Sequence, residues 1–485
     1  MIDRRNFLTA AGAAAAGVLG AAMPAPAQAK RWNFVFILTD DLGWADVGFN
    51  GSDFYETPNL DRFSRQGMRF DQGYAACPVC SPTRASIMTG KYPARLHITN
   101  FIPGPWRRTY ARLIPPEFQH ELPLEEATIP KALKPGGYRS AHIGKWHLGT
   151  AHTPSRQGFD YEFNTSGRHL YPNWKVNAPH QPRPGEHRWE RLTAEAEGFL
   201  EKHRAQPFFL HLSYHLPHIP LESRKELIDK YEAKLNQPRF RARKDLTTPA
   251  QNHPIYAAMI ESLDTSVGRV LRRLDETGLA ANTVVIFTSD NGGLSAREYE
   301  GRPTTSNAPL REGKGHIYEG GIRTPMLIRW PGVTKPGSVC DQVVSTIDFY
   351  PTLLDIAGLS GPAGHRPDGE SITPLLRQTG KLRRDAVYWH YPHYSNQGGD
   401  PGGAVRQGDF KLLEFYEDNH LELYDIRRDP GEKNNLAAKM PQKAAAMHKL
   451  LRAWLKETNA SMPAVNPKYD PKRSQEGLAW VKPLP

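Results

Sequence analysis

Two pairs of polar residues could bind a metal ion in this 485-residue sequence, because each pair follows an apolar run of strand length. The runs are residues 34–38 and 284–288. Together the pairs offer three carboxylates and one amide oxygen, donors that suit a hard cation, and calcium tolerates irregular geometry best. One isolated aspartate would more simply cap a helix or a turn. Two such pairs at two strand ends instead favour a cation site, made by Asp40, Asp41, Asp290 and Asn291.

A second chemical pattern is Cys80-x-Pro82-x-Arg84, which continues into Ala-Ser-Ile-Met-Thr-Gly. Cys77 and Cys80 have the Cys-x-x-Cys spacing of redox and zinc sites. The only other cysteine is Cys340, so no second pair follows at metal-binding spacing. The spacing alone therefore does not predict a zinc site.

Basic residues beside glycine or proline are candidates for binding an anion. Lys145 and His147 lie in Gly-Lys-Trp-His, His218 lies in Pro-His-Ile-Pro, and Lys314 lies in Gly-Lys-Gly. Glycines next to both lysines would let the backbone approach a tetrahedral anion closely. Each of these residues alone is more typical of a surface or the edge of a core. Their joint order along the chain is the informative feature.

These motifs, in this order, resemble the type I sulfatases, the formylglycine-dependent, arylsulfatase-like members of the alkaline phosphatase superfamily. The resemblance covers most of the chain after residue 30 and includes Thr57-Pro58-Asn59 and residues 319–325. It implies that a maturation enzyme oxidises Cys80 to formylglycine, whose hydrate attacks sulfate esters. It also implies a bound Ca²⁺ whose ligands are Asp40, Asp41, Asp290, Asn291 and an oxygen of residue 80.

The resemblance implies a role for each basic residue as well. The positive charges that offset the transferring sulfate would come from Arg84, Lys145 and Lys314. His218, with or without Lys314, would protonate the leaving oxygen, and His147 would accept a proton from the nucleophile. His215 is a second candidate for the acid. Which histidine is acid and which is base comes from the resemblance and not from this sequence.

Alternating strands and helices must position these residues. The apolar runs 34–38, 208–212 and 284–288 predict central strands of a parallel sheet buried on both faces, and residues 194–203 and 255–277 predict helices. Binding groups in open α/β sheets gather at the carboxyl ends of strands, where all three runs carry polar residues. We therefore expect an α/β fold with a large mixed, mostly parallel sheet flanked by helices. The resemblance makes this fold alkaline-phosphatase-like, with a smaller C-terminal α+β domain.

The N-terminus predicts export. Arg4-Arg5 resembles a twin-arginine motif, residues 10–23 are rich in alanine and glycine, and Ala27-Gln28-Ala29 offers a cleavage site. The apolar stretch is short and followed by prolines, which favours a cleaved signal over 1–29 rather than a membrane anchor. No later segment is long and apolar enough to span a bilayer. We expect a periplasmic or secreted protein.

Glycine and proline residues within 358–368 interrupt the helical pattern and predict a domain boundary there. The boundary divides a catalytic domain (30–365) from a C-terminal domain and tail (366–485). Short antiparallel strands are predicted at 404–406, 410–415 and 421–424, and a helix at 442–456. Aromatic and basic segments would either line a sugar-binding mouth or pack in loops; they are residues 106–108, 169–171 and 388–394.

Composition is that of a soluble globular protein, with 39% hydrophobic and 23% charged residues. The net charge of +11 is spread along the chain, so it predicts no nucleic-acid partner and favours anionic substrates. The sequence thus predicts an exported sulfatase that acts on a sulfated small molecule or glycan, with a carbohydrate favoured by export. Two alternatives remain: a phosphonate or phosphate ester hydrolase on the same fold, and a non-catalytic binder of sulfated glycans.

Overall fold

The computed structural model describes residues 31–105, 108–170, 173–177, 183–244, 250–298 and 301–476. The chain divides into a unit that ends at Arg31 and a compact unit from Trp32 onward. The predicted signal segment 1–29 lies outside the described residues, and the predicted boundary near residue 365 stays a prediction.

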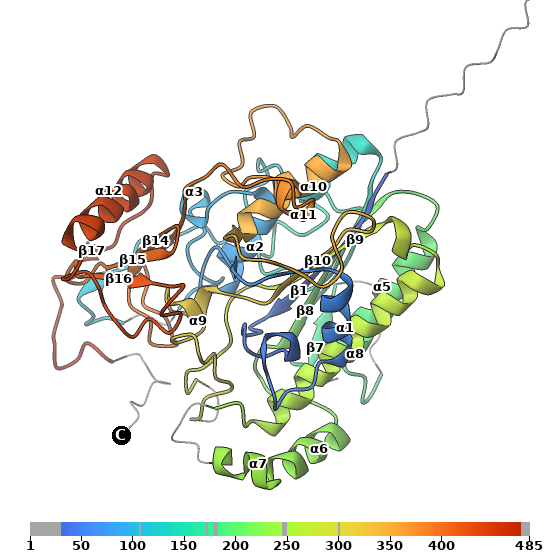
Figure 1. Ribbon diagram of the computed structural model, residues 1–485, viewed down its shortest axis with the longest axis horizontal. Coiled ribbons are helices and arrows are strands. Elements are labelled where there is room, and N and C mark those ends of the chain that lie inside the picture. Colours follow the sequence, from blue (N-terminus) through green and yellow to red (C-terminus); the bar gives the residue numbers. More distant parts are fainter. Residues whose placement is uncertain are drawn as a thin grey trace, which may run out of the picture. The chain divides into compact units, whose positions relative to one another are not determined.

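A large, mostly parallel sheet of nine described strands carries the site (Figure 1). Its order is β11 (Ser338–Cys340), β2 (Met68–Phe70), β10 (Met326–Arg329), β9 (Thr283–Ser289), β1 (Asn33–Asp40), β8 (Phe208–Pro217), β5 (Arg139–Gly144), β6 (Tyr161–Gly167) and β7 (Trp174–Val176). The five strands from β9 to β6 are mutually parallel, while β10 and β7 run antiparallel to their neighbours. The three apolar runs are adjacent central strands, which confirms the predicted fold class.

Helices cover both faces of this sheet because alternate side chains of each strand point to opposite faces. Val35 and Ile37 of β1 share a core with one set of helices, namely α1 (Pro58–Gln66), α5 (Arg188–Lys202), α6 (Lys225–Leu235) and α8 (Pro254–Glu276). Phe34 and Phe36 belong to the opposite core, with α2 (Cys80–Thr89), α4 (Ile129–Leu133), α10 (Phe349–Ala357) and α11 (Thr373–Leu376). The predicted helix 255–277 matches α8, whereas α5 begins six residues before the predicted 194–203.

A smaller antiparallel sheet follows in the chain, in the order β13 (Ala386–Tyr391), β14 (Gly402–Gln407), β15 (Phe410–Phe415) and β16 (Leu421–Asp425). Helix α12 (Pro441–Glu457) packs against it through Met447 and Leu451. The three predicted strands and the helix are confirmed. Strand β13 was not predicted, and its Trp389 and Tyr391 are buried core residues rather than the lining of a sugar-binding mouth.

The remaining short elements are α3 (Pro93–Leu96), α7 (Pro238–Arg241), α9 (Glu319–Ile322) and the two-stranded pairs β3 (Gly73–Tyr74) with β12 (Val344–Ser345) and β4 (Leu113–Ile114) with β17 (Ala464–Val465). Within the described ranges, no helix combines the length and apolar character needed to cross a bilayer.

Candidate active site

The candidate site lies at the carboxyl edge of four adjacent parallel strands, β9, β1, β8 and β5. Strand β1 ends at Asp40, and the other three strands end directly before Asp290, His218 and Lys145. The sequence predicted that three of these strand ends share a site, and the structure adds the fourth. Parallel strands place these carboxyl ends along one edge, so residues far apart in the sequence meet there.

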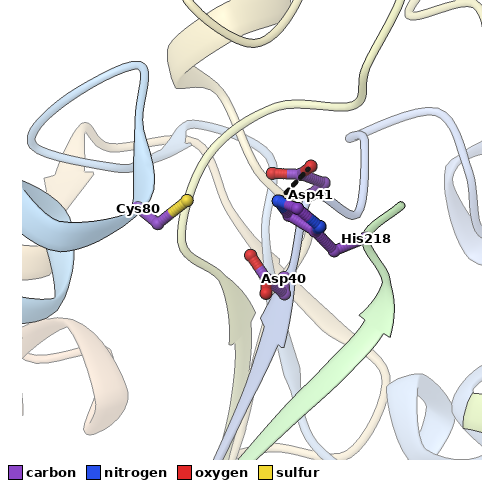
Figure 2. A group of neighbouring side chains, drawn as sticks. All are labelled: Asp40, Asp41, Cys80 and His218. Atoms are coloured by element: carbon purple, nitrogen blue, oxygen red, sulfur yellow. Dashed lines mark ion pairs between the residues drawn. The ribbon is translucent and has the colours of Figure 1, made fainter. Parts of the chain in front are cut away.

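The backbone at Asp41 turns two consecutive carboxylates toward the same place. Asp41 has φ 65°, a left-handed conformation that aspartate tolerates better than most residues. An extended residue would point its side chain away from that of Asp40. Ligand atoms of Asp40, Asp41, Cys80 and His218 lie within 4.8 Å of one another. Figure 2 shows how these four side chains point toward one another.

This cluster fits an oxygen-seeking cation. Asp40 Oδ1 and Asn291 Oδ1 are buried, and no described group donates a hydrogen bond to either atom. Buried acceptors are rarely left without a partner, so both oxygens are suited to a cation that completes the site. Both oxygens of Asp290, in contrast, accept hydrogen bonds from the protein. Oδ2 accepts from Arg84, and Oδ1 accepts from the backbone N–H of Asp41 at 3.2 Å. The carboxylate and amide oxygens of Asp40, Asp41, Asp290 and Asn291 are donors that suit a hard cation.

Cys80 and Arg84 lie one turn apart on the same face of α2, which explains the spacing of the Cys-x-Pro-x-Arg pattern. Pro82 is tolerated because it lies in the first turn, where a backbone N–H has no helical partner. Burial raises the pKa of the Cys80 thiol to about 12. An unmodified thiol would therefore be protonated at neutral pH and a poor nucleophile.

Arg84 is a buried anchor of the site. Its Nε and Nη2 donate to Asp290 Oδ2 at 2.9 and 2.6 Å, and its Nη1 donates to Ser213 Oγ at 2.6 Å and to the Lys145 carbonyl at 3.0 Å. Ser213 on β8 was not among the predicted site residues. Its position at the end of a buried apolar run was the available signal.

Each of two lysines is paired with one carboxylate. Lys145 Nζ donates to Asp40 Oδ2 at 2.5 Å, and Lys314 Nζ donates to Asp41 Oδ2 at 2.7 Å. Burial opposes the charge of Asp40, but Lys145 and its cationic neighbours outweigh burial and hold the pKa of Asp40 well below its usual range. In the same way, Asp41 and the other negative groups nearby together outweigh burial and raise the pKa of Lys314 well above its usual range. Both pairs are therefore ionic.

The two predicted histidines have defined contacts. His147 Nε2 lies 2.6 Å from the Ile102 carbonyl and so carries the proton, which leaves the buried Nδ1 as an acceptor without a described partner. His218 Nδ1 lies 2.5 Å from the Ile219 carbonyl, and its Nε2 lies 3.6 Å from Asp41 Oδ2. Burial, assisted by Lys145 for His147 and by Lys314 for His218, lowers the pKa of both rings. Both are neutral at pH 7.

A cavity of about 470 Å³ opens beside these groups. Its polar lining includes Lys145, His147, His169, Arg188, His215 and His218. Neither His169 nor Arg188 was among the predicted catalytic or metal-binding residues. His169 lay in a segment considered for sugar binding, whereas Arg188 carried no signal, because a lone arginine at a helix start is usually exposed. The cavity is the candidate substrate site.

Residues of the C-terminal sheet hold the segment that carries Lys314. Lys411 Nζ donates to Glu319 Oε1 at 3.1 Å and to Glu432 Oε1 at 3.0 Å, and Glu432 Oε2 accepts from the Glu319 backbone N–H at 2.7 Å. All three side chains are buried. Next to Lys314, Gly315 has φ 83°, and a Cβ there would lie 2.0 Å from Ser395 Oγ. The position of Lys314 thus depends on residues more than 80 positions further along the chain.

Comparison with known proteins agrees with this geometry. The profile of the Sulfatase family matches residues 32–359, and the family described as N-sulphoglucosamine sulphohydrolase, C-terminal, matches residues 313–460. A sulfatase of Formosa agariphila is 32% identical over 89% of this chain and 90% of its own length. The N-acetylgalactosamine-6-sulfatase of Mus musculus is 33% identical over 86% of this chain and 84% of its own. The crystal structure of Ps i-CgsB in complex with k-i-k-neocarrahexaose has a TM-score of 0.74 and 27% identity, covering 93% of this chain and 98% of that one.

Proposed function

The chain belongs to the sulfatase family and is a sulfuric ester hydrolase, and we propose that it is an exported enzyme that removes sulfate monoesters from carbohydrates. The position of Cys80 carries the proposal: its sulfur lies among the carboxylates of a candidate cation site, next to cations suited to sulfate. The similarity to an N-acetylgalactosamine-6-sulfatase and to a structure in complex with k-i-k-neocarrahexaose supports a carbohydrate substrate.

We propose that residue 80 acts as formylglycine and that the adjacent site holds Ca²⁺. When present, the hydrated aldehyde supplies an oxygen nucleophile, and the cation supplies positive charge that favours its deprotonation. The residues that would hold the cation are Asp40, Asp41, Asp290 and Asn291, with residue 80.

The remaining residues divide the work of binding and proton transfer. Arg84, Lys145 and Lys314 are fixed by carboxylates, so their positive charge is in place before sulfate arrives and offsets charge in the transition state. His147 Nδ1 is the buried acceptor placed to take a proton. His218 Nε2 and Lys314 Nζ both approach Asp41 Oδ2, at 3.6 and 2.7 Å. Because His218 is neutral with Nδ1 at the Ile219 carbonyl, the charged Lys314 is the source of the proton for the leaving oxygen, directly or through His218.

The deciding experiment is the mass of the peptide that contains residue 80, from protein purified out of its own cells. We expect an aldehyde in place of the thiol, together with release of sulfate from an aryl sulfate. Cys80→Ala should abolish hydrolysis. The matched control is Cys77→Ala, which changes a buried cysteine outside the cluster and should retain activity.

The alternatives give different results. Faster hydrolysis of an aryl phosphonate than of the aryl sulfate would favour a phosphonate hydrolase. An unmodified cysteine in the native protein, with glycan binding but no sulfate release, would favour the non-catalytic binder.

The proposed export is tested separately. Replacing Arg4-Arg5 by two lysines should retain the protein in the cytoplasm, and cell fractionation measures this. Unchanged secretion of that variant would contradict twin-arginine export.

A further inference from the structure

Arg188 is a buried cation that forms no ion pair with any acidic residue in the described ranges, although Asp40 and Glu222 act on its charge from a longer distance. It is the first residue of α5, it lines the cavity beside Lys145 and His218, and its exposed fraction is 2%. No described carboxylate lies within ion-pair distance of it. Burial lowers the pKa of its guanidinium to about 9, which still leaves it charged at neutral pH.

Neutral groups hold this guanidinium in place. Nη1 donates to the Gly167 carbonyl at 2.7 Å, and Nη2 lies 3.2 Å from His169 Nδ1. His169 Nε2 lies 2.8 Å from the His218 carbonyl, so the His169 proton is on Nε2 and its Nδ1 accepts from Arg188. Arg188 Nε is buried and has no described acceptor. The side chain is therefore fixed but not neutralised.

The charged residues that line the cavity are all basic in the part of the chain that the structure describes. The lining carries two cations, Lys145 and Arg188, and four histidines, but none of the described lining residues is acidic. Lys145 is already paired with Asp40, whereas Arg188 is not paired. A buried charge without a counter-charge is destabilising, and an anion that enters the cavity would offset this cost.

We propose that Arg188 binds a second anionic substituent, either a carboxylate or another sulfate, on the same saccharide that carries the sulfate to be cleaved. This inference rests on the proposed function and names the class of substrate. The enzyme would thus act on polyanionic saccharides in preference to singly sulfated neutral sugars. Arginine suits both groups, because its planar fork donates two parallel hydrogen bonds to carboxylate or sulfate oxygens.

A neighbouring arginine provides a matched control. Arg168 lies close in sequence, but its Nε is 2.5 Å from Glu222 Oε1, it is half-exposed, and it is not among the described residues that line the cavity. Its charge is balanced by Glu222, so removing it takes no unpaired cation from the cavity. Arg168→Gln and Arg188→Gln therefore separate a general loss of positive charge from loss of the proposed subsite.

The test measures binding without turnover. Calorimetry in a Cys80→Ala background compares three ligands: a hexose monosulfate, the same hexose with a second sulfate, and the hexose monosulfate linked to a uronic acid. We expect one of the two dianionic ligands to bind at least tenfold more tightly than the monosulfate. Arg188→Gln should remove this preference, and Arg168→Gln should keep it. The preferred ligand distinguishes a carboxylate from a second sulfate.

Turnover by the matured enzyme gives a second readout. Arg188→Gln should lower kcat/KM for the preferred dianionic substrate about a hundredfold and for the monosulfate less than threefold. Equal losses on all substrates would assign Arg188 to positioning through His169 and overturn the proposal. Absence of any dianionic preference in the Cys80→Ala protein would also overturn it, even if Arg188→Gln does not fold. Failure of the proposed function would appear separately, as an aldehyde-bearing enzyme that releases no sulfate from any ligand.

Discussion

Lys314 Nζ donates a hydrogen bond to Asp41 Oδ2 at 2.7 Å, although 273 positions separate the two residues in the sequence. His218 Nε2 approaches the same oxygen to 3.6 Å. One carboxylate oxygen therefore helps to position both a charged lysine and a neutral histidine. The geometry of the site depends on how firmly the segment around Lys314 is held.

Lys411 should be essential for stability. Lys411→Met would leave the Glu319 and Glu432 carboxylates buried without a cation between them, which costs about 3–5 kcal/mol when one partner of a buried pair is removed. Denaturant unfolding measures the loss, and sulfate release should fall because the Lys314 segment is loosened. Lys439→Met, at an exposed position, should change neither property. Equal stability of the two variants would contradict the role of this buried cluster.

Gly315 should be required for activity. Gly315→Ala places a Cβ 2.0 Å from Ser395 Oγ at a residue with φ 83°, so Ser395 or Lys314 must move. Gly332→Ala is the matched control, because Gly332 has φ 75° but nothing within 4 Å of the added Cβ. We expect a loss of kcat of tenfold or more in Gly315→Ala and wild-type kcat in Gly332→Ala. Similar kinetics for both variants would show that the site tolerates the displacement.

Calcium should stabilise the folded protein. Binding at one hundred times the dissociation constant contributes about 2.7 kcal/mol, so a chelator should lower Tm and abolish sulfate release. Asn291→Leu removes one of the two buried site oxygens that accept no hydrogen bond from a described group, and it should abolish the calcium-dependent shift in Tm. Asn434→Leu, on the exposed surface, should retain the shift. A wild-type Tm that does not respond to calcium would exclude a calcium site.

The protein should lose stability in mild acid. His142 and His211, on adjacent strands β5 and β8, face each other with their Nδ1 atoms 2.9 Å apart, and both rings are buried. Burial lowers the pKa of His142 to about 3 and that of His211 well below its usual range, whereas unfolded histidine titrates near 6.5.

The sign of the effect follows from which state binds protons. Above pH 6.5 both states are neutral and the stability is fully present. As pH falls from 6.5 toward 3, both histidines bind protons in the unfolded chain but stay neutral in the folded protein. The free energy of unfolding therefore falls by about 1.4 kcal/mol per pH unit for each histidine. Replacing both by asparagine should reduce the slope of the unfolding free energy between pH 6 and 4.5 by the contribution of two histidines, while the other buried histidines keep the rest of the slope. His420→Asn, at an exposed histidine, should leave the wild-type slope, and an unchanged slope in the double variant would contradict the assignment.

The sequence predicted the centre of the sheet well because fully buried strands carry a continuous apolar pattern, as residues 34–38 and 284–288 do. Strand β5 escaped detection because its buried face includes His142, which interrupts such a pattern. Strand β13 escaped for a similar reason, since His390 and its tyrosine neighbours resemble a binding surface. In both strands, tertiary packing places a polar ring inside the core, and local sequence does not show this.

The candidate site was predicted as a set of residues but not as a network. The spacing of Cys80 and Arg84 already indicates one helical face, a signal that sequence reasoning had available. The absence of an acidic partner at Arg188 is different, because it depends on the surroundings that the fold provides. Sequence patterns show which groups are present, and the fold determines which of them stay unpaired.

The burial of Cys80 also has a consequence for the order of events in the cell. Only 2% of the residue is exposed, and α2 shares a hydrophobic core with the sheet and α10. If an enzyme oxidises this cysteine, as proposed, it must reach the chain before α2 docks against the sheet. Oxidation of Cys80 must then take place before folding is complete. A chain that folds with an unmodified Cys80 stays inactive. Slowing translation or folding should therefore raise the active fraction of the protein without any change in its sequence.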